Sequence, residues 1–274
     1  MQRYFLDGNS PALDVPALVG ANYHHAIRVL RMQPGDALEV VREGKAYRAT
    51  LERIDGERER AHLTIGAEIA ASAEPVMPLI LLQALPKGDK IDLILRQTCE
   101  IGVSRIIVYA GARSVAALPA GKRAERTVRW NRIAREAAEL AHRTLSPEVL
   151  IADSLDDACA SLEAGTHLLA PYESQTAALP SLKQVLQERV GHPGGTGGAV
   201  APIAFAIGPE GGFADAEVAL LRQRGAALLT LGPRIFRTET AGVVVAAAVL
   251  YELDQLGGVQ TERLANGGLS HSGL

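Results

Sequence analysis

Hydrophobic and polar residues change their spacing along this chain of 274 residues, and the change divides it into two parts. In the first part, residues 37–41, 46–51 and 60–65 alternate loosely between apolar and polar positions, with turns containing Gly or Asp between them. A period of two is typical of half-buried β-strands. Only residues 24–32 have a helical pattern. The pattern therefore predicts a small β-barrel in residues 1–72.

The second part follows a segment with two prolines, residues 73–78, which we interpret as a linker. Continuous apolar runs then predict buried strands at residues 79–84, 105–109, 166–170, 201–207 and 226–231. Helical patterns at residues 89–101 and 123–142 lie between them, and another follows each of the last two strands. Alternating strands and helices indicate an α/β fold in residues 73–256, with a mostly parallel sheet covered on both faces.

Two segments are expected to lack regular structure. Residues 191–198 are rich in Gly and predict a mobile surface loop. Residues 257–274 contain few apolar side chains, and we interpret them as a disordered tail.

The last helical pattern, residues 241–250, is apolar on every side. Such a helix must be buried all round, which favours packing against the sheet on one side and against a second subunit on the other. A helix buried within a single subunit is the alternative. A membrane span is not favoured, because about 20 apolar residues are needed to cross a bilayer.

Composition narrows the class of protein. With 47% hydrophobic residues, the chain can bury a large core. No hydrophobic segment follows Met1-Gln2-Arg3, so neither a signal peptide nor a membrane anchor is expected. Cys99 and Cys159 do not make a disulfide framework, which favours buried thiols in a cytoplasmic protein. The seven histidines show no metal-ligand spacing, so no metal is expected.

The distribution of charge bears on whether the chain binds nucleic acid. Net charge is only −3, but Lys and Arg outnumber Asp and Glu over residues 83–145, whereas residues 146–172 contain acidic side chains and no Lys or Arg. The cations near the predicted helix 123–142 are Lys122, Arg123, Arg126, Arg129, Arg132 and Arg135. Their spacing places them on one helical face, as expected of a surface that binds a nucleic-acid backbone. A solvated face partly neutralised by Glu125, Glu136 and Glu139 is the alternative.

Two segments near the C-terminus have the strongest pattern for a binding site. They are Ile207-Gly208-Pro209-Glu210-Gly211-Gly212-Phe213 and Leu231-Gly232-Pro233-Arg234-Ile235-Phe236-Arg237-Thr238-Glu239-Thr240-Ala241. Each follows a predicted strand and precedes a helix, so both are expected at the sheet edge where α/β proteins bind ligands. Neither has the spacing of a P-loop or of a dinucleotide fingerprint. The segments predict one composite pocket, with ordinary tight turns as the alternative.

Residues 237–240 of the second segment place a cation, two hydroxyls and a carboxylate before a very apolar helix. Thr238 or Thr240 would suit a helix N-cap, and Glu239 is favourable in a first helical turn. These capping roles do not explain Arg237, because a positive charge is unfavourable at a helix N-terminus.

These segments resemble those of a known family. Residues 75–254 are similar to the SPOUT (α/β-knot) class of S-adenosylmethionine-dependent RNA methyltransferases, and the whole chain resembles the ribosomal RNA small subunit methyltransferase E family. Besides the two glycine segments, the resemblance rests on Lys87-Gly88-Asp89-Lys90, Glu100-Ile101-Gly102-Val103, Arg113-Ser114-Val115, Glu136-Ala137-Ala138-Glu139, His25, Val29-Leu30-Arg31-Met32 and Gly35-Asp36. The chain departs from the family at Leu140-Ala141-His142-Arg143, where Gln-Ser/Cys-Gly-Arg is usual. It also has Gln97 in place of a common lysine, and Phe236 in place of leucine.

The resemblance implies a trefoil-knotted sheet domain preceded by a PUA-like, RNA-binding β-barrel, and a homodimer. It implies S-adenosylmethionine as cofactor and methylation of N3 of a uridine in 16S rRNA of the small ribosomal subunit. Arg237 is the residue expected to stabilise charge on the uracil oxygens, and Glu239 is a weaker candidate for the base. A ribose 2′-hydroxyl as methyl acceptor, or a non-catalytic RNA-binding assembly factor, are the alternatives.

The remaining site residues are expected in two groups. Those expected at the cofactor are Leu169, Ala170, Pro171, Gly208, Pro209, Glu210, Gly211, Gly212, Leu231, Gly232, Ile235, Phe236, Thr238 and Thr240. Those expected at RNA are Arg31, Lys87, Arg113, Arg126, Arg129, Arg135 and Arg143.

Overall fold

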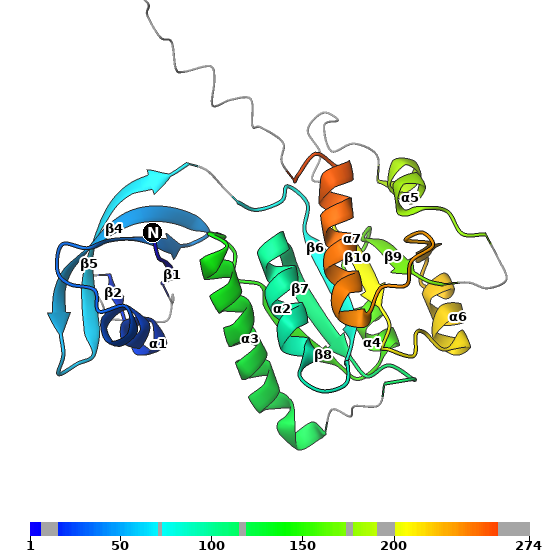
Figure 1. Cartoon of the computed structure of the whole chain (residues 1–274), viewed down its shortest axis with the longest axis horizontal. Helices are drawn as coiled ribbons and strands as arrows, with labels where there is room; N and C mark the ends of the chain where they lie inside the picture. Colours follow the sequence, from blue (N-terminus) through cyan, green and yellow to red (C-terminus); the bar gives the residue numbers. More distant parts are fainter. Residues whose placement is uncertain (7–15, 71–72, 115–118, 174–177, 191–200, 257–274) are drawn as a thin grey trace, which may run out of the picture.

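The chain folds into two parts, each built on its own β-sheet (Figure 1). The computed structural model describes residues 1–6, 16–70, 73–114, 119–173, 178–190 and 201–256. The predicted loop 191–198 and tail 257–274 lie outside the described residues.

The N-terminal part is a five-stranded sheet with the order β1-β3-β4-β5-β2. Its strands are β1 (Arg3–Phe5), β2 (Ala17–Leu18), β3 (Ala37–Arg42), β4 (Lys45–Asp55) and β5 (Arg60–Ile69). The three strands expected from alternation are β3, β4 and β5, and the last two are longer than predicted. The strands β1 and β2 were not predicted, because three and two residues are too few to show a period.

A tight turn sets the register of β3 against β4. Arg42 pairs with Lys45, so only Glu43 and Gly44 connect the strands. Both have positive φ, 52° and 76°, as a two-residue turn matched to the strand twist requires.

The helical segment of this part begins earlier and winds more loosely than predicted. Helix α1 (Gly20–Tyr23) continues into a π-helix (His24–Val29), whereas the sequence predicted a helix over residues 24–32. Tyr23 and Ala26 are buried against the sheet. The chain then leaves the helix through Arg31, which has a φ of 56°.

The C-terminal part is a six-stranded sheet with the order β11-β9-β10-β6-β7-β8, and every neighbouring pair is parallel. Its strands are β6 (Leu79–Ala84), β7 (Val103–Tyr109), β8 (Glu148–Ala152), β9 (His167–Pro171), β10 (Ile203–Ile207) and β11 (Ala227–Leu229). The predicted parallel sheet is therefore confirmed. The prediction missed β8, an edge strand in which only Val149 is fully buried.

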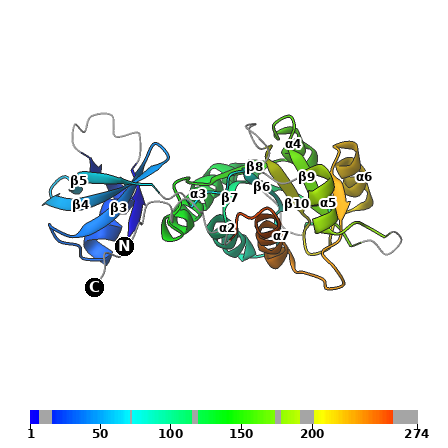
Figure 2. The ribbon, with the colours of Figure 1, turned by 90° about the horizontal axis from the view of Figure 1, so that it is seen from above.

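Helices cover both faces of this sheet, as Figures 1 and 2 show. They are α2 (Lys90–Ile101), α3 (Arg123–Leu140), α4 (Leu155–Ala160), α5 (Leu182–Arg189), α6 (Asp215–Gln223) and α7 (Thr238–Glu252), and a short 3₁₀ helix (Ala120–Lys122) precedes α3. Buried side chains of α2, α3, α5 and α7 form one core with the sheet. Those of α4 and α6 form a second core on the opposite face.

Strand β6 shows why the sheet is buried on both faces. Leu79 and Leu81 belong to the first core, and Ile80 and Leu82 belong to the second, in the alternation of a strand covered on both sides. All six residues of β6 are buried, including Gln83, the one polar residue among them.

The two parts meet where β1 lies against the C-terminal end of α3. Phe5 and Ala138 share a small apolar cluster. The backbone N–H of Phe5 donates to Oε1 of Glu139 over 3.1 Å, and Arg135 donates to the carbonyl oxygen of Phe5. Among the described residues, no helix is both long enough and apolar enough to cross a membrane.

Candidate active site

The polar loops of the C-terminal part meet at one edge of its sheet. Because neighbouring strands are parallel, the carboxyl ends of β6, β9, β10 and β11 lie at the same edge. Residues 85–89 leave this edge after β6, residues 208–213 after β10 and residues 230–237 after β11. The two glycine segments thus lie at the edge where the sequence predicted them.

The first glycine segment turns too tightly for larger residues. A Cβ atom at Gly208 would lie 3.2 Å from the backbone of Gly212, and one at Gly211 would lie 3.3 Å from Cβ of Arg113. Gly212 has a φ of 68°, and its N–H donates to the carbonyl oxygen of Pro209 over 2.9 Å. Gly211 and Gly212 are exposed, so a ligand can approach this turn closely.

The second glycine segment combines buried and exposed apolar side chains. Leu231 and Phe236 are half-buried and pack against the core shared with α7. The side chain of Ile235, by contrast, is 78% exposed. Gly232 has a φ of 95° and open space where a Cβ would be. This arrangement offers a free apolar surface beside exposed backbone.

A buried hydrogen-bond chain joins the two segments. Gln83 Nε2 donates to Oγ1 of Thr238 over 3.0 Å, and Thr238 Oγ1 donates to the carbonyl oxygen of Gly208 over 2.8 Å. Gln83 is fully buried, and Thr238 is 5% exposed. The hydroxyl of Thr238 therefore fixes the start of α7 against the first segment.

A second, more exposed contact involves Lys90 at the start of α2. Its Nζ lies 2.9 Å from Oε1 of Glu210 and 3.4 Å from Oε2 of Glu239. Partial burial acts to raise the pKa of Glu210, but hydrogen bonds, chiefly from Lys90, outweigh it and lower that pKa. The hydrogen bond with Glu210 raises the pKa of Lys90. One ammonium group thus links both glycine segments to α2.

The first segment is also held from its other side. Arg113 donates to the carbonyl oxygen of Gly211 over 3.0 Å. The carboxylate of Glu217 accepts the backbone N–H groups of Ala112 and Ala214, at 2.9 and 2.8 Å. The loop after β7 and the start of α6 therefore brace the segment.

Arg237 carries a positive charge that no described residue neutralises. Its carbonyl oxygen accepts the N–H groups of Thr240 and Ala241, which places it at the N-cap of α7. The side chain is exposed, and no described residue forms an ion pair or hydrogen bond with its guanidinium group. Within the described part of the chain, the second glycine segment therefore presents a cation without a partner.

A surface hollow elsewhere in the C-terminal part does not belong to this site. It is lined by residues of α5, α6 and the amino end of β11, including Arg189, Arg222 and Ala226, and so lies at the opposite edge of the sheet. Among the described residues, no cluster of His, Cys, Asp and Glu has the arrangement of a metal site.

Comparison with known proteins identifies the family. Residues 72–250 match the family model of an RNA methyltransferase domain, and residues 18–64 match that of an RNA methyltransferase PUA domain. Ribosomal RNA small subunit methyltransferase E of Synechocystis sp. is 31% identical to this chain, over 85% of the chain and 71% of the relative. The chain belongs to the ribosomal RNA small subunit methyltransferase E family.

Two further relatives cover nearly the whole chain. The Bacillus subtilis ribosomal RNA small subunit methyltransferase E is 28% identical over 95% of this chain and 100% of its own length. A crystal structure of the Neisseria gonorrhoeae enzyme bound to S-adenosyl methionine has a TM-score of 0.73 and 27% identity, and covers 92% of this chain and 97% of that one. The two-part architecture is therefore that of the small subunit methyltransferase E family.

The residues that were predicted to contact the cofactor differ in their exposure to solvent. Pro209 and Thr238 are buried, as are Leu169 and Ala170, whose side chains point into opposite cores from within β9. The exposed members of the predicted set are Glu210, Gly211, Gly212, Gly232, Ile235 and Thr240, and the half-buried ones are Pro171, Gly208, Leu231 and Phe236. Surface for a ligand thus comes mainly from the two glycine segments.

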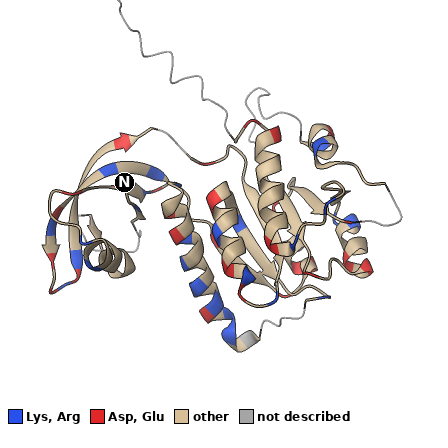
Figure 3. Cartoon of the chain, viewed as in Figure 1, with Lys and Arg blue, Asp and Glu red and all other residues tan. Residues whose placement is uncertain are grey.

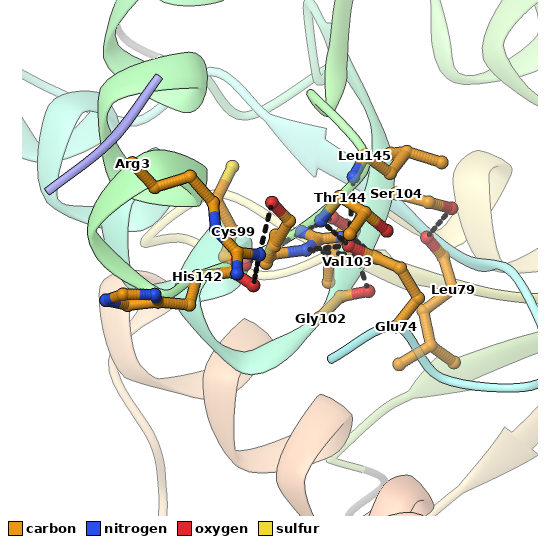
Figure 4. A network of polar contacts seen from close by, with 11 residues as sticks. Arg3, Glu74, Leu79, Cys99, Gly102, Val103, Ser104, His142, Thr144 and Leu145 are labelled. Carbon is orange, nitrogen blue, oxygen red and sulfur yellow. Dashed lines mark hydrogen bonds and ion pairs between the residues drawn. The ribbon is translucent and has the colours of Figure 1, made fainter. Parts of the chain in front are cut away.

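The side chain of Arg143 is buried and does not lie on the predicted RNA-binding surface. It is 1% exposed, and it donates to Glu74 Oε2 and to the carbonyl oxygens of Cys99 and Val103. Figure 4 labels these three partners. The prediction that Arg143 contacts RNA is wrong, because its guanidinium is enclosed by the linker carboxylate and the C-terminal end of α2.

Lys and Arg residues lie along the length of α3 (Figure 3), but ion pairs neutralise many of them. Arg129 pairs with Asp92, Arg123 with Asp153 and Arg132 with Glu136, while Arg135 is bound to Glu139 and Phe5. The alternative of a partly paired, solvated face therefore applies to much of this helix. Arg31, Lys87 and Arg113 are exposed elsewhere.

The sequence analysis missed two site residues, Gln83 and Lys90. Gln83 has a local signal, because it is the one polar residue in an apolar strand run. Lys90 was noted only as part of a motif, and its contacts with Glu210 and Glu239 span too many residues to be visible in a sequence.

Proposed function

We propose that this protein methylates N3 of a uridine in 16S rRNA, with S-adenosylmethionine as methyl donor. The observation that carries the proposal is the pair of glycine segments joined at one sheet edge, where the guanidinium of Arg237 has no partner among the described residues, in a chain of this family. The crystal structure of the Neisseria gonorrhoeae relative, which is bound to S-adenosyl methionine, supports the choice of cofactor.

The residues at this edge fit such a cofactor. Gly211, Gly212 and Gly232 are exposed and have no side chains, which allows an adenine ring to approach the backbone of these turns closely. The exposed side chain of Ile235 offers apolar contact to a ring. Bound there, adenosylmethionine supplies a methyl group activated by its sulfonium centre.

The protein's own task is to orient and activate the uracil. N3 carries a proton and lies on the pairing edge of the base, so the nucleotide must be unpaired or turned out of a helix. Loss of that proton places negative charge on O2 and O4. We assign the guanidinium of Arg237 to stabilise this charge, because it is exposed and lies at the N-cap of α7.

Glu239 is the weaker candidate as proton acceptor. Its side chain is 15% exposed, and its carboxylate lies 3.4 Å from Nζ of Lys90. The same ammonium group also binds Glu210, so the carboxylate of Glu239 is engaged within the protein. We therefore assign no step to Glu239 beyond its contact with Lys90.

Further elements of the proposal concern assembly and topology. We propose a homodimer that packs through α7, because Val243, Val244, Ala247 and Ala248 are only half-buried and Tyr251 is 72% exposed.

We also propose that residues 231–252 complete a trefoil knot. In support, β11 lies at the sheet edge, whereas α7 returns to pack on α2, β6 and β10. Because the proposed substrate is ribosomal RNA, we place the protein in the cytoplasm.

Transfer of labelled methyl groups from adenosylmethionine tests the function. Small ribosomal subunits and naked 16S rRNA would be the acceptors, followed by nucleoside analysis. N3-methyluridine is the expected product. Label at a ribose 2′-hydroxyl would overturn the assigned position, and no transfer to either RNA would favour a non-catalytic assembly factor.

A further inference from the structure

The contacts of Lys90 join three segments that are far apart in the sequence. Lys90 begins α2, directly after the loop that leaves β6. Its Nζ is 2.9 Å from Glu210 in the first glycine segment and 3.4 Å from Glu239 in the first turn of α7. The same Oε1 atom of Glu210 accepts the backbone N–H of Lys87 over 3.1 Å.

Charge makes this arrangement depend on the lysine. Two carboxylates share one ammonium group, so the cluster carries an excess negative charge even when it is intact. Removing the ammonium would leave Glu210 and Glu239 facing the same space without a counter-ion, and like charges repel at such distances. Glu210 belongs to an exposed loop and is therefore the group free to move away.

Stability alone does not explain the contact. The side chains of Lys90 and Glu210 are 37% and 36% exposed, and exposed ion pairs contribute little to folding. The buried link from Gln83 through Thr238 to Gly208 already ties the inner ends of both segments together. Lys90 acts farther out, on the exposed turn that contains Gly211 and Gly212.

We propose that Lys90 is a positioning residue that holds the exposed turn of the first glycine segment against the start of α7, in the arrangement that binds adenosylmethionine. The inference rests on the proposed cofactor site but not on the identity of the methylated atom. Lys90 acts through Glu210 and Glu239 and makes no contact of its own with the reacting groups.

Two measurements without RNA test the proposal, with wild type, Lys90→Met and Lys90→Arg compared. Calorimetry measures the Kd for adenosylmethionine. Hydrogen exchange of the ligand-free protein measures how fast the backbone amides of residues 208–213 exchange with solvent. Lys90→Met is expected to raise Kd about fivefold, which corresponds to about 1 kcal/mol. It is also expected to speed exchange in residues 208–213 but not in β6. Lys90→Arg is expected to restore most of both values.

The matched control is Lys183→Met. Lys183 is an exposed lysine of α5 whose Nζ lies 3.4 Å from Oε1 of Glu252 in α7. The substitution is expected to leave the Kd and the exchange of residues 208–213 unchanged. Steady-state kinetics adds a third measurement, in which Lys90→Met raises the KM for adenosylmethionine and leaves the KM for RNA unchanged.

Unchanged Kd and exchange in Lys90→Met would overturn the proposal. A rise confined to the KM for RNA would overturn it too, because Lys90 would then contact the substrate. These outcomes are distinct from failure of the proposed function, because a product other than N3-methyluridine leaves the cofactor measurements intact.

Discussion

The imidazole Nδ1 of His142 lies 2.9 Å from Oε2 of Glu39, and this contact joins the end of α3 to strand β3 of the N-terminal sheet. The same oxygen accepts two hydrogen bonds from Arg3, at 3.0 and 2.8 Å. His142 has a φ of 56°, in the left-handed region that glycine adopts most easily. The contact between His142 and Glu39 thus clamps the two parts of the chain together.

This clamp predicts a loss of stability in acid. Partial burial acts to raise the pKa of Glu39, but hydrogen bonds from Arg3 and His142 outweigh it and lower that pKa below 4.5. The folded protein therefore binds fewer protons at Glu39 than the unfolded chain does. The stabilisation is fully present above pH 4.5 and is lost as the pH falls through the folded value.

Thermal midpoints measured from neutral pH down to about pH 3 test this linkage. Glu39→Gln is expected to lower the midpoint at neutral pH and to flatten its fall below pH 4.5. Glu43→Gln is the control, because Glu43 is 84% exposed and, among the described residues, pairs only with Arg42, at 3.6 Å. An equal acid dependence in Glu39→Gln and wild type would show that the clamp does not contribute.

Substitution of the buried Arg143 is expected to lower stability strongly without removing a contact with RNA. Arg143→Met would remove the guanidinium that donates to Oε2 of Glu74 and to the carbonyl oxygens of Cys99 and Val103, while Oε1 of Glu74 would keep the N–H groups of Thr144 and Leu145. Removal of one partner of a buried ion pair costs about 3–5 kcal/mol. The thermal midpoint should fall accordingly, whereas Arg132→Met, at an exposed pair with Glu136, should change it little.

A second measurement distinguishes this role from RNA binding. The salt dependence of rRNA affinity for Arg143→Met, measured below its midpoint, is expected to match that of wild type, because the guanidinium is enclosed. A flatter salt dependence with an unchanged midpoint would restore Arg143 to the RNA surface.

The contrast between Arg143 and the glycine segments shows how far sequence reasoning extends. Tight turns after apolar strands are encoded locally, so the edge that holds residues 208–213 and 231–237 was predictable. The orientation of the Arg143 side chain depends on the left-handed backbone conformation at His142 and on the contact with Glu74, which is 69 residues away in the sequence. Helices α4 and α5 were missed for a different reason, because six and eight residues are too few to show a helical period.

The buried chain from Gln83 to Gly208 predicts non-additive stability effects. Thr238→Val removes the hydroxyl that accepts from Gln83 and donates to Gly208, leaving buried polar groups unsatisfied at a cost of about 1–3 kcal/mol. The double variant Gln83→Leu/Thr238→Val should cost less than the sum of the single changes, because it removes both polar partners. Urea unfolding measures each value.

Thr64→Val serves as the control for this series, because its hydroxyl bonds to Glu52 at an exposed site on β5. It is expected to change the free energy of unfolding by less than about 0.5 kcal/mol. Strictly additive effects of Gln83→Leu and Thr238→Val would contradict the hydrogen-bond chain.

Arg237 predicts a defect in turnover rather than in folding. Its guanidinium is exposed and has no partner among the described residues, so Arg237→Ala should leave the thermal midpoint nearly unchanged. Loss of a group that stabilises charge at O2 or O4 should lower kcat by roughly 100-fold or more. Arg234→Ala, an exposed change in the same segment, is the comparison. Near-normal kcat in Arg237→Ala would remove the residue from the mechanism.

Lys87 and Arg129 predict different contributions to RNA binding, although both were expected at its backbone. Lys87 is exposed, and its ammonium has no carboxylate partner among the described residues, so Lys87→Ala should reduce the salt slope of rRNA affinity by about 1. Arg129 is already paired with Asp92, whose side chain is 18% exposed. Arg129→Ala should therefore change the slope less, because Asp92 competes with phosphate for the same cation. Affinities measured by filter binding across a series of KCl concentrations give both slopes. An equal or larger change in Arg129→Ala would mean that RNA displaces Asp92 and that the basic face of α3 binds phosphate directly.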